Sequence, residues 1–336
     1  GAGYLAVAKA ALLPSLLYYF SLLMMIHFEA VNKNIGIIPA DQIPDPRSVL
    51  RRTYHILPII VLIGLLVSGR SVISSAFISI ASVIVVSCFS AETRFTPKSL
   101  YHTLELSSRN ALMISTCSAC AGIIGVISLT GIGYKFINVI TALAGSNLLL
   151  LMAMLMVTCI ILGMGVPTAP AYIIVATLGA PALMKAGVPI IAAHMFVYFY
   201  AILSVITPPV CLAAFAGAAI AETNAMKTGV TAMKLGIVAF IIPFMFVFEP
   251  ALLMQGSTTE IVTAFTSALV GVIGVASGIQ NWLLVRCRLW ERALLLASGL
   301  MLIFPGLITD TIGLSSLLIV LFAQRLRRSG SPVAAA

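Results

Sequence analysis

The chain has 336 residues, of which 61% are hydrophobic and only 9% are charged, and its mean hydropathy is +1.13. Soluble globular proteins carry about 25% charged residues, so this composition excludes a protein whose whole surface faces water. The net charge of +9 does not indicate a nucleic-acid-binding protein, because the basic residues lie between long apolar stretches. These stretches are continuous, not alternating, so we predict an all-α integral membrane protein surrounded by a lipid bilayer.

Apolar stretches that fit a crossing of the bilayer, about 20 residues long, are expected at 8–28, 111–129, 237–254 and 261–279. The shorter stretches 57–67 and 72–89 form either two helices or one broken helix. Segment 97–109, which is amphipathic and charged, and segment 226–234 are predicted to lie along the membrane surface. Segment 282–292 is amphipathic and basic. Stretches 294–304 and 312–322 form a second apolar pair. A change in character near residue 255 divides the chain into a membrane domain, 1–255, and a membrane-associated C-terminal extension, 256–336.

Two pairs of short apolar segments are interrupted by glycine and proline. Segments 148–162 and 169–184 flank the sequence GMGVPT at 163–168, and segments 190–205 and 210–220 flank ITPP at 206–209. An arm of about 15 residues is only ~22 Å long at 1.5 Å per residue, which is short for a complete crossing. The first pair therefore predicts a re-entrant hairpin with its tip at 163–168, and the second predicts a discontinuous helix.

The first break contains residues suited to an ion or substrate site. Gly163 and Gly165 permit a close approach of the backbone, Pro167 starts a new half-helix, and Thr168 offers a hydroxyl at its N-terminus. Breaks of this kind are tolerated at membrane depth where protein or a wet cavity satisfies the freed backbone groups.

The second break offers a similar set of oxygens. Pro208 and Pro209 lack N–H groups, so the carbonyls of Ser204 and Val205 are expected to be unpaired, beside the hydroxyls of Ser204 and Thr207. Neutral oxygens suit Na⁺ better than a divalent metal, which would require carboxylates. Half-helix N-termini at Thr168 and Pro209 would favour a negatively charged solute. The alternative interpretation is that both breaks are only kinks in packed helices. The candidate Na⁺ ligands are Gly163, Gly165, Thr168, Ser204 and Thr207.

A few other residues are candidates for a role. His194 is interpreted as a packed or surface histidine, with a proton or substrate role as the alternative. Glu249 is either a functional intramembrane group or an interfacial residue near a helix end. Asn147, together with Ser146, is expected to cap the first arm of the hairpin or to line a polar path. Cys117 and Cys120 form a CxxC that is interpreted as packing, because no second pair or nearby histidine completes a metal set.

The stretches that carry these breaks resemble the large membrane subunit of tripartite ATP-independent periplasmic (TRAP) transporters, closest to the fused permeases of the TAXI type. The resemblance rests on GMGVPT at 163–168, AAHMFVYFYAILSVITPPVCLAAFAGAAIAE at 192–222 and FIIPFMFVFEPALLMQG at 240–256, and the stretch at 9–30 also fits. It covers residues 1–256. The remaining tail is similar, more weakly, to an extension found on some fused permeases.

This resemblance implies an elevator-type fold with two inverted repeats, each holding one hairpin and one discontinuous helix, of which only the second repeat is present here. It implies a secondary transporter subunit in the bacterial inner membrane that imports a small organic anion with Na⁺ as the coupling ion. The implied partners are a periplasmic solute-binding protein and the missing N-terminal half of the permease, in the same or a separate chain. Transport by this chain alone is therefore not expected.

Other functions compete with this interpretation. A related carrier coupled to H⁺ would work without a binding protein. A non-transporting membrane subunit would have no reason to break two helices. An intramembrane enzyme would need a catalytic dyad or metal ligands at membrane depth, whereas the ionisable residues there are scattered, so we expect no enzyme activity and no cofactor.

Overall fold

The computed structural model describes residues 3–35, 42–43, 45–90, 93–111, 122, 126, 129–303 and 306–329. Within these ranges the regular elements are helices, apart from one isolated bridge between Trp282 and Arg286. The predicted span at 111–129, with its two cysteines, lies almost entirely outside the described residues. The all-α membrane class is confirmed by helices long and apolar enough to cross a bilayer, which in the described part are Tyr4–Asn32, Ala225–Phe248, Thr258–Gln280 and Ile308–Arg327.

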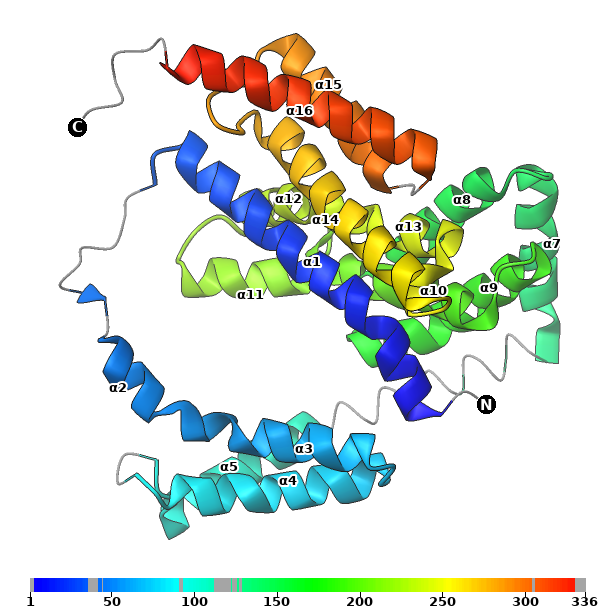
Figure 1. The fold of residues 1–336 in the computed structure, drawn as a ribbon. Helices are drawn as coiled ribbons and strands as arrows, with labels where there is room; N and C mark the ends of the chain where they lie inside the picture. Colours follow the sequence, from blue (N-terminus) through cyan, green and yellow to red (C-terminus); the bar gives the residue numbers. More distant parts are fainter. Residues whose placement is uncertain are drawn as a thin grey trace. The chain divides into compact units, whose positions relative to one another are not determined.

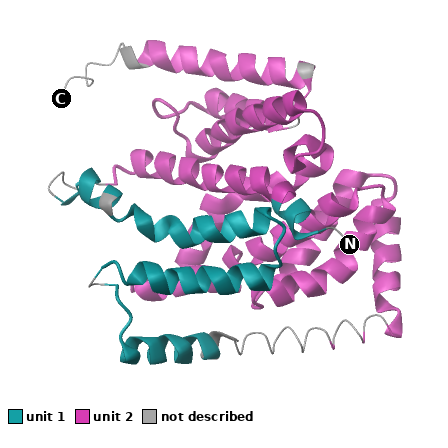
Figure 2. Cartoon of the chain, turned by 60° about the horizontal axis from the view of Figure 1, so that its bottom comes forward, with its two compact units in different colours: residues 1–8, 36–116 teal, residues 9–35, 117–336 magenta. Residues whose placement is uncertain are grey.

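The chain divides into two compact units, which Figure 2 distinguishes by colour. Unit 1 comprises residues 1–8 and 36–116, and unit 2 comprises residues 9–35 and 117–336. The long helix α1 (Tyr4–Asn32) begins in unit 1 and continues into unit 2.

Unit 1 is built around a pair of apolar helices that pack against each other, α3 (Leu57–Val67) and α4 (Val72–Ser87) (Figure 1). The predicted stretches 57–67 and 72–89 are therefore two helices. Ser79 Oγ donates to the Pro58 carbonyl at 2.8 Å and ties them together. Apolar side chains on this pair are exposed, as expected of a lipid-facing surface, with Ile73 85% accessible. The other helices of unit 1 are α2 (Pro46–Arg51), η2 (Thr53–Ile56) and the predicted amphipathic segment, α5 (Pro97–Ala111).

Unit 2 contains both predicted breaks. Its core is formed by large buried side chains such as Phe196, Tyr200 and Phe246, which come from helices on both sides of the second break. Phe196 and Tyr200 stack edge to face at 4.8 Å between ring centres. The helices in this part are α7 (Ile132–Ala144), α8 (Leu148–Gly163), α9 (Thr168–Lys185), α10 (Ile190–Leu203), η3 (Ser204–Ile206), α11 (Leu212–Ile220) and α12 (Ala225–Gly236).

The segment after α11 differs from its prediction. Residues 226–234 were expected on the surface and 237–254 as a separate span, but α12 runs directly into η4 (Ile237–Phe240) and α13 (Ile242–Phe248), and Ala225–Phe248 is one candidate span. Pro243 lies at the start of α13, where its missing N–H costs no hydrogen bond. The buried Tyr200 hydroxyl donates to the Phe240 carbonyl at 2.7 Å and satisfies the end of η4. A short helix, η5 (Pro250–Leu253), follows.

The C-terminal part forms three packed helices, α14 (Thr258–Gln280), α15 (Leu289–Ile303) and α16 (Leu307–Ser329), in yellow to red in Figure 1. The predicted amphipathic segment 282–292 is only partly helical. Asn281 has φ 59° and ends α14, and α15 begins at Leu289. Gln280 joins this part to α1, because its side-chain Nε2 donates to the Met25 carbonyl at 3.1 Å and its backbone carbonyl accepts from Asn32 Nδ2 at 3.0 Å.

Candidate functional site

The first break lies between two helices packed against each other. The helix α8 ends at Gly163 and α9 begins at Thr168 with Pro167 as its N-cap, as predicted, while Gly165 has a left-handed φ of 76°. Asn147 caps α8 by accepting from the Leu150 N–H at 3.0 Å, so the capping interpretation is confirmed. The packing of α8 on α9 gives the expected helical hairpin. Its entry and exit on one membrane face remain a prediction.

The second break is longer than predicted. The helix α10 ends at Leu203, Thr207 is extended, and α11 begins only at Leu212, so the second half-helix does not start at Pro209. Consecutive prolines explain the difference, because Pro208 lacks an N–H and each proline pushes the preceding residue toward an extended conformation.

The polar groups of the second break are paired in a way that corrects the sequence-based expectation. The Ser204 carbonyl is not unpaired, since it accepts from the Thr207 N–H at 3.2 Å. The buried hydroxyls of Ser204 and Thr207 donate to the carbonyls of Ala201 and Leu203, each at 2.7 Å. Both hydroxyl protons are thereby used, but the oxygen lone pairs that a cation would bind are not.

The two breaks meet in space. A Cβ placed on Gly163 would lie 2.6 Å from Ser204 Oγ and 3.0 Å from its Cβ, so only glycine allows this approach. A Cβ placed on Gly165 would lie 3.3 Å from Val210 Cγ1. The tip of the hairpin therefore lies against both ends of the interrupted part of the second helix.

The remaining predicted residues are placed less centrally. Thr168 and Pro167 are half-buried at the start of α9, while Pro209 is exposed ahead of α11. The contacts that join the first break to the second are those of Gly163 with Ser204 and of Gly165 with Val210.

Sequence reasoning missed the part that α12 plays. A Cβ on Gly229 would lie 3.7 Å from Pro208 Cγ, and one on Gly236 would lie 2.8 Å from Ile206 Cδ1, so α12 packs directly on the second break. The sequence does contain an indication of this contact, because Gly229 and Gly236 are seven residues apart and so lie on one face of a helix. The surface interpretation of 226–234 concealed it.

An aromatic and histidine cluster joins the hairpin to the discontinuous helix. The Tyr172 hydroxyl on α9 and His194 Nδ1 on α10 are 2.9 Å apart, and the rings of Tyr172 and Tyr198 meet edge to face at 5.5 Å. His194 is thus a packed histidine, as interpreted from the sequence. The two tyrosines could not be predicted, because the adjacency of α9 and α10 is a tertiary contact.

Glu249 lies at a helix end. It is the N-cap of η5, and its Oε1 accepts from the Ala251 N–H at 3.3 Å. This position fits the helix-end interpretation of Glu249.

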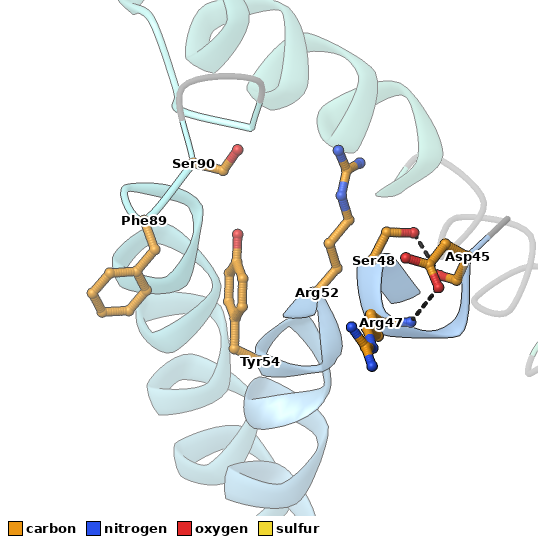
Figure 3. Close-up of a pocket in the computed structure, with 7 residues that line it drawn as sticks. All are labelled: Asp45, Arg47, Ser48, Arg52, Tyr54, Phe89 and Ser90. Atoms are coloured by element: carbon orange, nitrogen blue, oxygen red, sulfur yellow. Dashed lines mark hydrogen bonds between the residues drawn. The ribbon is translucent and has the colours of Figure 1, made fainter. Parts of the chain in front are cut away.

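A separate open cavity of about 700 Å³ lies in unit 1 and contains none of the predicted site residues. Figure 3 shows the Arg52 guanidinium, the Tyr54 hydroxyl and the Ser90 hydroxyl around one open space. Nearby, Asp45 accepts from the Arg47 N–H at 3.2 Å and caps α2. Arginine and tyrosine beside exposed apolar helices are typical of a membrane interface.

The comparisons with known proteins agree with the resemblance seen in the sequence. A family model described as "Tripartite ATP-independent periplasmic transporter, DctM component" matches residues 1–261, which include both breaks. A second model, "Domain of unknown function (DUF3394)", matches residues 261–316, from the first turns of α14 into α16. No curated protein and no solved structure matches the chain. The resemblance is therefore confirmed.

Proposed function

Because the chain belongs to the DctM-component family of tripartite ATP-independent periplasmic transporters, whose members are transporter components and not enzymes, we propose that it takes part in the Na⁺-coupled import of a small organic anion. In this proposal the chain is a multi-pass subunit in the bacterial inner membrane, and a periplasmic binding protein delivers the solute. The N-terminal half of the permease, in the same or a separate chain, supplies the first repeat of an elevator-type fold.

The observation that carries the proposal is the contact between Gly163 and Ser204. Two interrupted helices whose breaks touch place several backbone and hydroxyl oxygens at one point. A structural subunit gains nothing from two adjoining breaks, since each removes intrahelical hydrogen bonds that lipid cannot replace. An ion bound by oxygens from both elements would explain why the two helices are interrupted at the same place.

The chemistry of the oxygens favours a monovalent cation. Neither 163–168 nor 204–211 contains a charged residue, so the ligands on offer from this chain are neutral. Ser204 and Thr207 hold their hydroxyl protons toward helix carbonyls, which leaves the oxygen lone pairs for a cation. A divalent metal would require carboxylates to compensate its dehydration. The N-terminus of α9 at Thr168 adds a partial positive charge that favours an anionic solute.

Substitution of Thr207 by valine tests the proposal, because it keeps the shape and removes the hydroxyl oxygen. In the complete transporter, reconstituted with its binding protein, Thr207→Val should raise the Na⁺ concentration for half-maximal uptake roughly 5- to 150-fold, as expected for the loss of one buried oxygen ligand. Ser204→Ala should act in the same direction. The measurement is the initial rate of solute uptake into proteoliposomes over a series of Na⁺ concentrations.

Thr177→Val is the matched control. Thr177 also donates its hydroxyl to a helix carbonyl, that of Ile174 at 2.7 Å, but it lies within α9 and away from the tip. This variant should leave the Na⁺ dependence unchanged. Unaltered Na⁺ dependence in both Thr207→Val and Ser204→Ala would overturn the assignment of the site. Uptake driven by a pH gradient without Na⁺ would favour a proton-coupled carrier instead.

A further inference from the structure

The C-terminal helices α15 and α16 form a second hairpin, whose base is held together by a buried carboxylate. Glu291, at the start of α15, is 1% exposed, and its Oε2 accepts from two side chains of α16, Gln324 Nε2 at 3.0 Å and Arg327 Nη2 at 3.1 Å. Gln324 Oε1 in turn accepts from two backbone N–H groups of the loop 281–288. The loop, the start of α15 and the end of α16 therefore lie together.

The tip of this hairpin lies at the other end, against the middle of α14. Ser267 Oγ on α14 is 2.9 Å from the carbonyl oxygen of Leu302, near the end of α15, and 2.7 Å from Oδ1 of Asp310, near the start of α16. Asp310 and Arg327 are roughly 25 Å apart along α16, at 1.5 Å per residue. Because α16 contains the candidate span Ile308–Arg327, the base of the hairpin lies where a crossing helix reaches a membrane surface.

Positive charge is concentrated at the base. From residue 281 onward the sequence contains six arginines, all within 286–292 or 325–328, and two carboxylates, Glu291 and Asp310. Asp310 lies at the tip, and Glu291 is paired with Arg327. The carboxylates of this part of the chain therefore leave most of the arginine charge at the base without compensation.

Hydrogen bonds bring these arginines together from three segments of the chain. Arg327 Nη2, on α16, donates to the Arg286 carbonyl of the loop at 2.7 Å. Arg292 Nε, on α15, donates to the Gly278 carbonyl near the end of α14 at 2.8 Å. Like charges gathered at one place repel each other, so this arrangement favours the binding of an anion. The arginines with exposed side chains at the base are Arg286, Arg288, Arg292 and Arg325.

Large apolar side chains are exposed beside the arginines. Leu289, which follows Arg288 in the chain, is 86% exposed, and Trp290, Phe322 and Leu326 are exposed as well. Tryptophan and arginine together are typical of the boundary between membrane and water. A small free anion would gain nothing from the apolar side chains. A phospholipid can contact them with its acyl chains while its phosphate binds the guanidinium groups.

We propose that the base of the α15–α16 hairpin is a binding surface for the headgroups of anionic phospholipids, formed by Arg286, Arg288, Arg292 and Arg325. An anionic headgroup such as that of phosphatidylglycerol presents an uncompensated phosphate charge, whereas the ammonium group of phosphatidylcholine is repelled by the arginines. Lipid binding at this surface anchors the C-terminal extension to one face of the membrane. The surface is separate from the two breaks, and the proposal stands whether or not these bind Na⁺.

Quenching of Trp290 fluorescence by brominated lipids tests the surface, because bromine on an acyl chain quenches a tryptophan that it contacts. The complete transporter is reconstituted in phosphatidylcholine bilayers that contain a fixed fraction of brominated lipid, either phosphatidylglycerol or phosphatidylcholine. The fluorescence that is lost in Trp290→Phe reports on the base alone. We expect this part to show a preference for phosphatidylglycerol of roughly fivefold or more, as for at least one arginine at an anionic surface. Equal quenching by the two lipids would overturn the proposal.

A pair of triple variants tests the role of the arginines. Arg286→Gln, Arg288→Gln and Arg325→Gln, combined, should abolish the preference for phosphatidylglycerol and leave quenching by brominated phosphatidylcholine unchanged, because the base still lies in the membrane. The preference should persist in the matched control, and its loss there, or its survival in the arginine variant, would contradict the proposal. Suppression of the preference by free glycerol phosphate, at constant ionic strength, would show a site for small anions and would also overturn it. The control removes the same charge from exposed basic residues elsewhere in the chain by glutamine substitution of Arg70, Lys98 and Lys227.

Discussion

The α8–α9 and α15–α16 hairpins are built alike but present different chemistry at their tips. The first meets a helix that is itself interrupted, at 207–211, and the second meets α14, which is continuous from Thr258 to Gln280. A broken helix exposes backbone groups that can act as neutral ligands. In a continuous helix the backbone groups are hydrogen-bonded within the helix. The polar groups at this tip are therefore side chains such as Ser267 and Asp310. The neighbour of a hairpin tip thus decides which polar groups lie at the tip.

Close contact is also achieved differently in the two hairpins. On α15, a Cβ on Gly299 would lie 2.6 Å from the Val275 backbone nitrogen and 2.7 Å from the Gly271 carbonyl oxygen, so backbone faces backbone. At the first tip, Gly163 faces the side chain of Ser204. A side chain can be shortened or moved, whereas two helix backbones can only separate. The contact at Gly299 should therefore be less tolerant of substitution than the contact at Gly163.

The largest effect on stability is expected from Gly299→Ala. The added methyl would force α14 and α15 apart, at a cost of roughly 3 kcal/mol or more. Thermal unfolding of the purified protein in detergent measures the loss. Gly217→Ala is the control, since a Cβ there meets nothing within 4 Å and alanine favours a helix. Equal melting temperatures for the two variants would refute the backbone contact.

A smaller loss of stability, roughly 1–3 kcal/mol, is expected from Gly163→Ala, because the Ser204 side chain can move and relieve part of the clash. The same melting assay applies here. Ser204→Gly in the Gly163→Ala background removes both Ser204 atoms that crowd the new methyl, and the nearest remaining atom, Ala201 Cα, would lie at an ordinary 3.7 Å. The double variant should therefore regain stability relative to Gly163→Ala alone. If the stability losses of Gly163→Ala and Ser204→Gly simply add in the double variant, the two breaks do not touch.

The smallest effect, about 1 kcal/mol, is expected from Tyr200→Phe, which removes the hydrogen bond to the Phe240 carbonyl. This bond ties the discontinuous helix to the 3₁₀ turn that continues α12. At the α15–α16 tip, a comparable bond joins Ser267 Oγ to the Leu302 carbonyl at 2.9 Å. Tyr19→Phe, at a position 69% exposed, is the control. A melting temperature unchanged in both variants would show that the bond contributes nothing.

Much of the fold could be predicted from the sequence. Charge-poor stretches of about 20 residues have few stable alternatives to a helix in a bilayer, because every backbone group must be paired within the segment. Glycine and proline act locally on the backbone, so the ends of α8 and the start of α9 were predicted to within a residue. Asn147 was identified as a cap for the same reason.

Other features were decided by tertiary structure alone. The sequence could indicate that 163–168 and 204–209 are both broken, but only packing shows that Gly163 faces Ser204. The role of α12, the pairing of Tyr172 with His194 and the position of Asp310 beside Ser267 depend on helices distant in the chain. Local sequence sets backbone preferences over one or two turns. Contacts between helices depend on the shape of whole faces, which no short stretch of sequence contains.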